Sequence, residues 1–385
     1  EMDILLLLGA AQAFFMTIFL FNKKGKTHAD YVLEVWLIFM GIHLLYVYLW
    51  TTGFLYRHPH FLGTGAAFNM LEGVFMYVYV LLMLSKTGKF KLIYLLHTLP
   101  FITFTIYYMF EFYFLSADEK LIHYDNIINE DLSKTLKIMS FPNMISVPIY
   151  VVISLLKLRS HSKNLSARFS YTEKISLNWL KFIVVGLGIF TLSSIVGMIL
   201  ESYPFVSNVM HYQIGYLGLA IAIFFLGYYG IRQQAIYKPP TEPLSSEKEL
   251  TLGSSRKKVE SRYLHSGLKD NEADKYRQEL LDFFNVEKPY LNGKLSLQEV
   301  AEHLDVSVNH LSQVINEKIG KTFFDFVNDY RIEEVKIKLA NFKNQSFTIL
   351  ALAFDSGFNS KSSFNNIFKK STGVTPSQYV KMKTQ

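Results

Sequence analysis

Residues 349–370 read ILALAFDSGFNSKSSFNNIFKK and contain two helical patterns separated by a turn. Apolar residues repeat at helical spacing up to Phe354, Gly357 can adopt a positive φ, and Ser360 is suited to cap a second helix. This second helix begins at Lys361 and carries a polar face. The arrangement predicts a helix-turn-helix, the unit that places its second helix in the major groove of DNA.

A similar pattern occurs about fifty residues earlier, which indicates an internal repeat. Ser296 to Glu299 form a capping box, Asp305 turns the chain, and Ser307 can cap a helix from Val308 to Lys318 that ends at Gly320. The spacing from Ala301 to Asp305 equals that from Ala353 to Gly357, as a helix crossing followed by a tight turn requires. We therefore expect two helix-turn-helix units.

A long amphipathic helix is predicted between the two units. Thr322 can cap it, and the pattern runs from Phe323 to Ala340. A further helix from Asn271 to Phe284 is expected to lead into the domain. The side chains expected to face a core in the connecting helix are Phe326, Tyr330, Ile332, Val335 and Leu339.

The last hundred residues or so resemble the AraC/XylS family of bacterial transcription regulators. The segments that carry the resemblance, in the family's order, are Asn309-His310-Leu311-Ser312-Gln313, Gly320-Lys321-Thr322-Phe323, Tyr330-Arg331, Ile349 with Leu352-Ala353, Gly357-Phe358, Ser360, Phe364, Phe368-Lys369-Lys370 and Gly373-Val374-Thr375-Pro376-Ser377-Gln378-Tyr379. The resemblance implies two recognition helices that enter successive major grooves on one face of the DNA. By position, it implies that the groove-facing residues are Asn309, Ser312, Gln313, Lys361, Ser362, Asn365 and Asn366.

The side-chain chemistry of these positions suits double-stranded DNA. Asn and Gln can bond adenine with two hydrogen bonds, and Lys or Ser can reach base edges or phosphates. Four lysines are candidates for phosphate contacts, with plain surface lysines as the alternative reading: Lys318, Lys321, Lys369 and Lys370.

The sequence departs from the family at three points. Many members carry arginine where this chain has Gln313 and Asn366, which favours weaker guanine reading or a more A·T-rich site. Asp305 replaces the usual turn glycine, so we expect a less tight first turn. The family also commonly has a soluble sensor ahead of the DNA module, whereas the preceding residues here are strongly apolar.

Composition indicates that part of the chain lies in lipid. Of its 385 residues, 50% are hydrophobic and 16% aromatic, while only 18% are charged. Apolar runs of spanning length predict seven transmembrane helices at 3–21, 31–50, 66–84, 91–114, 138–156, 180–200 and 212–231. The net charge of +7 suits an anionic membrane surface or nucleic acid, and the absence of cysteine excludes disulfides and cysteine-based sites.

The distribution of lysine and arginine predicts the orientation of the spans. Basic residues concentrate in the loops near 23–26, 86–91 and 157–181, which places those loops in the cytoplasm and the N terminus outside. We therefore expect an all-α protein of the inner (cytoplasmic) membrane. Its predicted parts are a seven-span sensor domain at 1–232, a flexible linker at 233–270 and a cytoplasmic DNA-binding domain of AraC type at 271–385.

Polar residues within apolar spans indicate a possible pocket open to the outside, for an external, lipidic or membrane-borne ligand. The candidates are His43, Asn69, Glu72, Glu111, Glu201 and His211. Alternatively, Glu111, Glu201 and His211 sit at the membrane interface and Asn69 bridges helices. A metal site formed by His43, Glu72 and His211 is conceivable, but no spacing requires it, and we expect no metal and no cofactor. Asp30 and Glu34 are expected to pair with loop lysines.

Two features of the spans leave alternatives open. Pro100, Pro142 and Pro148 are expected to kink or break their helices, either to make room for a cavity or hinge or without a function. Small residues of the seventh span, including Gly218 and Ala222, can serve packing inside the bundle or a dimer contact.

These observations predict a membrane-embedded one-component transcription regulator that acts as a homodimer on promoter DNA. The signal is expected to pass through the linker and the helix at 271–284. One alternative is an anchored regulator released by proteolysis within 238–266. Another is a transporter or membrane enzyme with a fused regulator, although no hydrolase motif or transporter repeat occurs and we expect no enzymatic activity.

Overall fold

The computed structural model describes residues 2–85, 87–128, 134–172, 175–200, 210–232, 268, 270–340 and 348–384. These residues form two compact units, one of residues 1–160 and 177–239 and the other of residues 161–176 and 240–385. Regular structure in the described ranges is helical, and one isolated antiparallel bridge joins Phe169 to Ser296. The predicted all-α class is therefore confirmed for this part of the chain.

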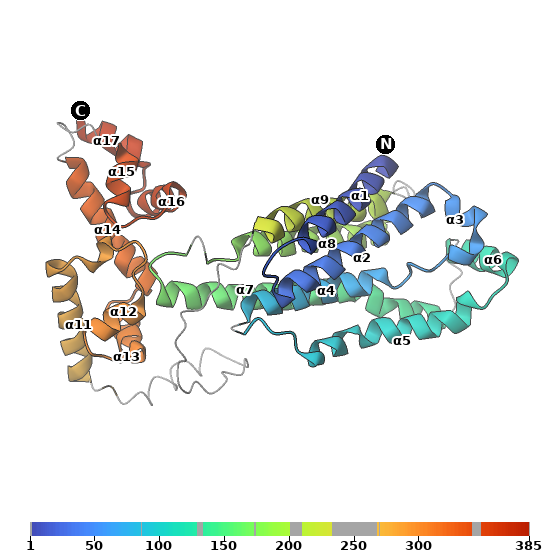
Figure 1. Ribbon diagram of the computed structural model, residues 1–385, viewed down its shortest axis with the longest axis horizontal. Helices are drawn as coiled ribbons and strands as arrows, with labels where there is room; N and C mark the ends of the chain where they lie inside the picture. The colour runs from blue at the N-terminus through green and yellow to red at the C-terminus, as the bar shows by residue number, and fades with distance from the viewer. Residues whose placement is uncertain are drawn as a thin grey trace. The chain divides into compact units, whose positions relative to one another are not determined.

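The first unit is a bundle of long apolar helices (Figure 1). Helix α1 packs against α2 and α9, α9 packs against α8, and α2 packs against α4. The helices are α1 (Met2–Phe21), α2 (His28–Thr51), α3 (Phe54–Arg57), α4 (Phe68–Leu84), α5 (Leu99–Tyr108), α6 (Ala117–Ile128), α7 (Lys134–Arg168, which belongs to this unit up to residue 160), α8 (Asn178–Leu200) and α9 (Met210–Arg232).

Four helical segments of the described residues are long and apolar enough to cross a membrane: Asp3–Phe21, His28–Thr51, Leu92–Tyr113 and Met144–Arg168. Three further apolar helical segments are shorter: Phe68–Leu84, Asn178–Ser193 and Gly218–Tyr229. Each of the seven predicted apolar runs thus overlaps one of these segments, and within the described residues four of the segments combine the length and the hydropathy of a span.

The prolines act differently from one another. Residues 91–114 do not form one regular α-helix, because a 3-10 segment (Leu92–Thr98) precedes α5 and a π turn (Met109–Tyr113) follows it. Pro100 lies in the first turn of α5, where backbone N–H groups have no partner within the helix, so the N–H that proline lacks is not needed there. Pro142 and Pro148 lie inside α7, which continues through both. The expected break is therefore found only at Pro100.

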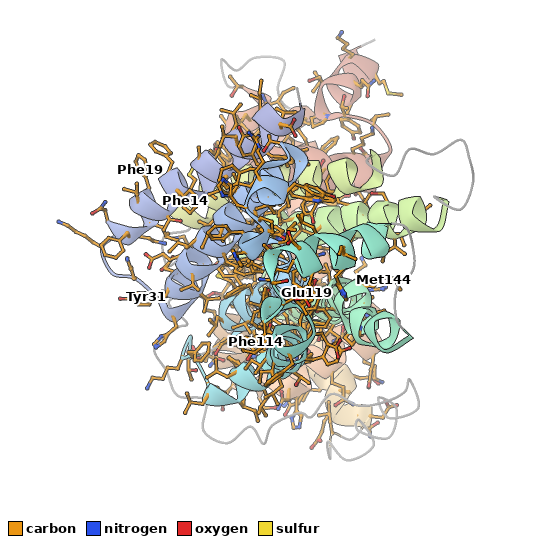
Figure 2. All side chains as sticks on the ribbon, turned by 90° about the vertical axis from the view of Figure 1, so that its right-hand side faces the viewer. Phe14, Phe19, Tyr31, Phe114, Glu119 and Met144 are labelled. Carbon is orange, nitrogen blue, oxygen red and sulfur yellow. The ribbon has the colours of Figure 1, made fainter. Side chains whose placement is uncertain are left out.

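The outer face of the bundle is apolar as well as its core. Trp36, Leu44 and Val184 are fully buried among the helices. Phe19 and Phe114 are 52% and 69% exposed, and Figure 2 shows both among the side chains that surround the helices. A helix that is apolar on its outer face as well as its inner one is typical of a segment surrounded by lipid.

The second unit contains the predicted pair of helix-turn-helix units. Its helices are α11 (Asp270–Val286), α12 (Leu297–His303), α13 (Val308–Gln313), α14 (Phe323–Ala340), α15 (Ile349–Phe354), α16 (Lys361–Thr372) and α17 (Pro376–Thr384). Most of the predicted linker, residues 233–267 and 269, lies outside the described residues. The predicted helices at 271–284 and 323–340 agree with α11 and α14.

Helix α14 joins two small hydrophobic cores of this unit. Phe326 and Val327, near its start, pack with α11, α12 and α13 in the first core. Ile332 and Val335, further along, pack with α15 and α16 in the second core. Because one rigid helix contributes to both cores, it sets the distance between the two helix-turn-helix units.

Candidate nucleic-acid interface and the buried polar cluster of the bundle

The two helix-turn-helix turns have the same hydrogen-bond pattern. Val306 N donates to Ala301 O at 2.9 Å, and Phe358 N donates to Ala353 O at 3.1 Å. Asp305 has φ 51° and Gly357 has φ 90°, so both occupy the left-handed region. The expectation of a looser first turn is wrong, because aspartate tolerates this conformation better than most residues with a side chain.

A serine caps each of the two recognition helices. The Ser307 side chain accepts from His310 N at the start of α13, and the Ser360 side chain accepts from Ser363 N at the start of α16. Helix α13 continues as a π turn over Val314–Lys318, so the predicted helix 308–318 is confirmed as two joined segments. Both recognition helices therefore begin at a serine N-cap, as the sequence predicts.

The residues predicted to face the DNA grooves differ in how available they are. Five are exposed: Asn309, Lys361, Ser362, Asn365 and Asn366. Ser312 and Gln313 are half-buried and already bonded within their helix, since Gln313 Nε2 donates to Glu317 at 2.9 Å and Asn316 Nδ2 donates to Ser312 O at 2.8 Å. Asn309 is therefore exposed, whereas the amide of Gln313 is already engaged within the helix.

Three of the four predicted phosphate-binding lysines are paired with carboxylates. Lys318 Nζ lies 2.6 Å from Asp270 and 2.9 Å from Asp274 of α11, and these hydrogen bonds raise its pKa. Lys321 and Lys370 lie 2.7 Å from Asp329 and 3.2 Å from Asp325, respectively. Among the described residues, Lys369 has no carboxylate within ion-pair distance. Lys318 therefore ties α11 to the first recognition helix, whereas Lys369 is available to a phosphate.

A cleft of about 510 Å³ lies between the end of the first recognition helix, the start of α14 and the end of α16. Asn316, Lys321, Asp325, Ile367 and Lys370 contribute to its walls. Sequence reasoning missed Asn316, although its place one helical turn after Ser312 could have indicated the same face.

In the bundle, a buried polar cluster forms around one carboxylate. Trp36 Nε1 donates to Glu72 Oε2 at 2.8 Å, and His43 Nδ1 lies 3.1 Å from Glu72 Oε1. The three side chains are between 0% and 8% exposed. Two of the predicted pocket candidates, His43 and Glu72, thus lie in contact with each other, while Trp36 was not among the candidates.

The other predicted pocket residues do not join this cluster. Asn69 and Glu111 are exposed at the surface of the bundle. Glu201 lies outside the described residues, and so does the His211 side chain. The described residues contain no group of three or more side chains able to hold a metal.

Two further expectations about the bundle can be compared with the structure. Lys23 lies 2.6 Å from Asp30 and Lys26 lies 2.5 Å from Glu34, which confirms the predicted loop pairs. A Cβ atom on Gly218 would overlap the ring of Phe190 in α8. This glycine therefore serves helix packing inside the bundle, which favours that reading over a dimer contact.

Comparison with known proteins identifies the C-terminal domain. Residues 300–382 match the model of a helix-turn-helix domain family. Over 90 residues, the chain is 38% identical to an uncharacterized HTH-type transcriptional regulator of Staphylococcus aureus (strain COL), a match that covers 23% of this chain and 12% of that protein. It is 30% identical over 91 residues to the melibiose operon regulatory protein of Escherichia coli (strain K12), covering 24% of this chain and 29% of that protein.

A solved structure of a protein of unknown function from Listeria innocua is 26% identical, with a TM-score of 0.25, and the match covers 27% of this chain and 94% of that one. The chain thus spans only a minor part of the length of the curated relatives it matches, and the family model matches residues 300–382. The C-terminal domain of this protein is a helix-turn-helix domain of the AraC type, similar to those of transcriptional regulators.

Proposed function

We propose that this protein is a membrane-embedded, one-component transcription regulator that binds promoter DNA sequence-specifically as a homodimer. The observation that carries the proposal is a pair of capped helices, α13 and α16, that expose Asn309 and Asn365 from one domain. Amide side chains can discriminate adenine in the major groove. The similarity to named transcriptional regulators supports the same function, and the proposal contains no enzymatic step.

The DNA-binding part of the proposal can be tested on the full-length chain in lipid nanodiscs. We would select from random duplexes of about 40 base pairs, long enough for two half-sites, at about 0.15 M salt. A selected sequence should bind two chains and outcompete the unselected pool. Asn309→Ala and Asn365→Ala should each weaken binding to it by about 5- to 150-fold, the range of one lost bidentate base contact.

Asn22→Ala is the matched control, because Asn22 is an exposed asparagine that follows α1 in the first unit, outside the DNA-binding domain. It should leave the affinity unchanged. If no sequence is enriched over the pool, the proposed function is wrong. If the Asn309 and Asn365 variants bind as tightly as the control, the assignment of the reading residues is wrong.

The membrane part of the proposal is a seven-span bundle with its N terminus outside and its DNA-binding domain in the cytoplasm. It is supported by seven apolar helical segments and by the lysine-rich loops on one side. Because the chain contains no cysteine, single introduced cysteines report topology without background. Thr52→Cys should react with an impermeant maleimide in intact cells, and Ser162→Cys only after permeabilisation. The reverse pattern would refute the orientation.

The sensing part of the proposal assigns the signal to the bundle and its Trp36–Glu72–His43 cluster. A buried carboxylate shared by two donors from another helix is costly in an apolar environment, and such groups usually have a function. Glu72→Gln retains an acceptor and a similar shape. If this variant keeps the full regulatory range of the protein on a reporter gene, the charge of Glu72 has no part in sensing.

A further inference from the structure

One buried arginine of the second unit is bound by a segment that lies far away in the sequence. Arg331, on α14, is 1% exposed. Its Nε donates to Tyr290 O at 2.8 Å, and its Nη atoms donate to Asn328 Oδ1 at 3.1 Å and Asn292 O at 2.9 Å. The Nη atoms also donate to the backbone O and the Oγ of Ser170, each at 3.0 Å. A single serine thus provides two of the five acceptors.

Ser170 is held in turn by the chain that leads into the first helix-turn-helix. Its N–H donates to Leu295 O at 3.2 Å, and its Oγ donates to the same oxygen at 2.6 Å. Asn328 Nδ2 donates to Ser170 O at 3.2 Å. The neighbouring Phe169 forms the antiparallel bridge with Ser296, the N-cap of α12. Residues 169–170 therefore lie against residues 295–296 through one isolated bridge, and Ser170 is only 1% exposed.

Arg331 also lies where the two helix-turn-helix units meet. Gly357 lies in the turn of the second helix-turn-helix. A Cβ atom on it would come against Tyr290 O and within 2.9 Å of Arg331 Nε. Asn359, two residues later, donates from Nδ2 to Gly293 O. Residues 290–296 thus contact Arg331, Ser170 and the second turn. The placement of both recognition helices therefore depends on whether Ser170 occupies the Arg331 site.

The charge of Arg331 makes this contact consequential. Burial lowers the pKa of its guanidinium to about 10, so the group remains charged near neutral pH. Its bonds within the described residues go to neutral oxygens rather than to a carboxylate. A buried cation that loses acceptors must rearrange its surroundings or recruit water. Departure of Ser170 would remove two of the five bonds and loosen the junction.

The covalent connections of Ser170 lead directly to apolar helices. It follows the last residue of α7, Arg168, by two positions, and α8 begins at Asn178. The connection between α9 and α11, residues 233–269, is much longer. A shift of α7 by one residue moves its end by about 1.5 Å. Such a shift is larger than the width, about 0.5 Å, of the interval of donor–acceptor distances over which N–H···O hydrogen bonds are made.

We propose that residues 169–170 are a docking segment that occupies the Arg331 site and couples the α7–α8 pair to the placement of the two recognition helices. The docked form is the form that binds DNA. The docked segment already orders the junction between the two helix-turn-helix units, which otherwise has to become ordered when both recognition helices bind DNA. This inference rests on the proposed function. It adds a second route for the signal besides the 233–270 connection, and a cut within 238–266 alone would leave Ser170 bound at Arg331.

Docking can be tested without DNA by a disulfide. Phe169 and Ser296 face each other across the bridge in a non-hydrogen-bonded position, where Cα atoms are about 4.5 Å apart, close enough for a disulfide. Because the chain has no cysteine, Phe169→Cys with Ser296→Cys creates a unique pair. In nanodiscs it should oxidise within one chain, which an electrophoretic shift reversed by reductant would show. Each single-cysteine variant should give no such shift. Failure of the pair to oxidise would overturn the docking.

Coupling is tested by the affinity of the same double variant for the selected duplex. The oxidised form should bind about fivefold or more tightly than the reduced form, a typical coupling between two sites. The selected duplex, compared with random duplex, should also speed oxidation, because coupling is reciprocal. Equal affinities would overturn the coupling, and tighter binding by the reduced form would overturn the assignment of the docked form as DNA-competent.

A milder variant keeps the test independent of the disulfide. Ser170→Ala removes the Oγ that Arg331 and Leu295 share and should weaken DNA binding about fivefold. Ser166→Ala is the matched control, because the bond of Ser166 Oγ among the described residues goes to Lys163 O of its own helix. Equal affinities of these two variants would count against the docking segment. If wild-type protein selects no duplex, the proposed function fails, while the disulfide still decides whether the segment docks.

Discussion

Replacement of Gly357 by alanine should disrupt the junction of the two helix-turn-helix units. Gly357 has φ 90°, and an added Cβ would come against Tyr290 O and within 2.9 Å of Arg331 Nε. Neither neighbour can move freely, because those two atoms form a 2.8 Å hydrogen bond with each other and both residues are buried. The substitution therefore acts through backbone strain and through a steric conflict together.

The magnitude follows from three contributions. A left-handed conformation costs alanine about 1 kcal/mol or more, and a forced shift in a packed interior costs about 1–3 kcal/mol. Weakening the charged bond of Arg331 adds about 1.5–3 kcal/mol. Since the last two share one displacement, we expect a total of about 3–5 kcal/mol, a large part of the 5–15 kcal/mol by which folded proteins are typically stable.

Asp305 provides the control at the equivalent turn. Asp305→Gly relieves the left-handed strain of φ 51° but adds conformational entropy to the unfolded chain. These effects are each about 0.5–1 kcal/mol and oppose each other, so the stability should change by less than about 0.5 kcal/mol.

Hydrogen exchange measured by mass spectrometry on the full chain in nanodiscs suits this comparison. Tryptophan fluorescence does not, because the three tryptophans, at positions 36, 50 and 179, all belong to the first unit. The amides of α15 and α16 exchange when the structure around them opens. The free energy of this opening should be about 3–5 kcal/mol lower in Gly357→Ala than in wild type. A change below about 1 kcal/mol would refute the close approach of the two helix-turn-helix units at Arg331.

Further expectations concern the lysines and the bundle. Lys369→Gln should lower the slope of log affinity against log salt by about one, as loss of one phosphate contact does, whereas Lys318→Gln should leave the slope unchanged because Lys318 is paired with α11. Titration of DNA binding with salt distinguishes these outcomes, and equal slopes would contradict the assignment. Glu72→Leu should destabilise the bundle by about 1–3 kcal/mol for each donor left unpaired, at Trp36 and at His43, whereas Glu72→Gln should cost less. Thermal unfolding in detergent, followed by tryptophan fluorescence, tests this order, and equal losses would refute it.

Local patterns predicted the helices of the second unit well, because caps and apolar spacing act within a few residues. Ser296, Ser307 and Ser360 cap their helices as expected. The same patterns failed where a contact joins separate elements. They gave no sign, for example, that Lys318, a candidate for a phosphate contact, is paired with Asp270 and Asp274 of α11.

In the bundle, composition identified apolar segments but not their neighbours. Hydropathy predicted the long apolar helices, because lipid imposes a similar length and polarity on any span. It could not show that α2 supplies both Trp36 and His43 to the carboxylate of Glu72 on α4. Asn69, three residues before Glu72, lies exposed in the first turn of α4, at the end of the helix.

The amino-acid sequence alone thus determined the helices, the repeat and the apolar half of the chain. Each of these depends on interactions between neighbours in the chain or on average polarity. Only the tertiary structure brought Ser170 to Arg331, which are 161 residues apart. Nothing in a local pattern marks such a partner, because a backbone carbonyl and a serine hydroxyl occur everywhere. The site exists only where folding buries a guanidinium and leaves it in need of acceptors.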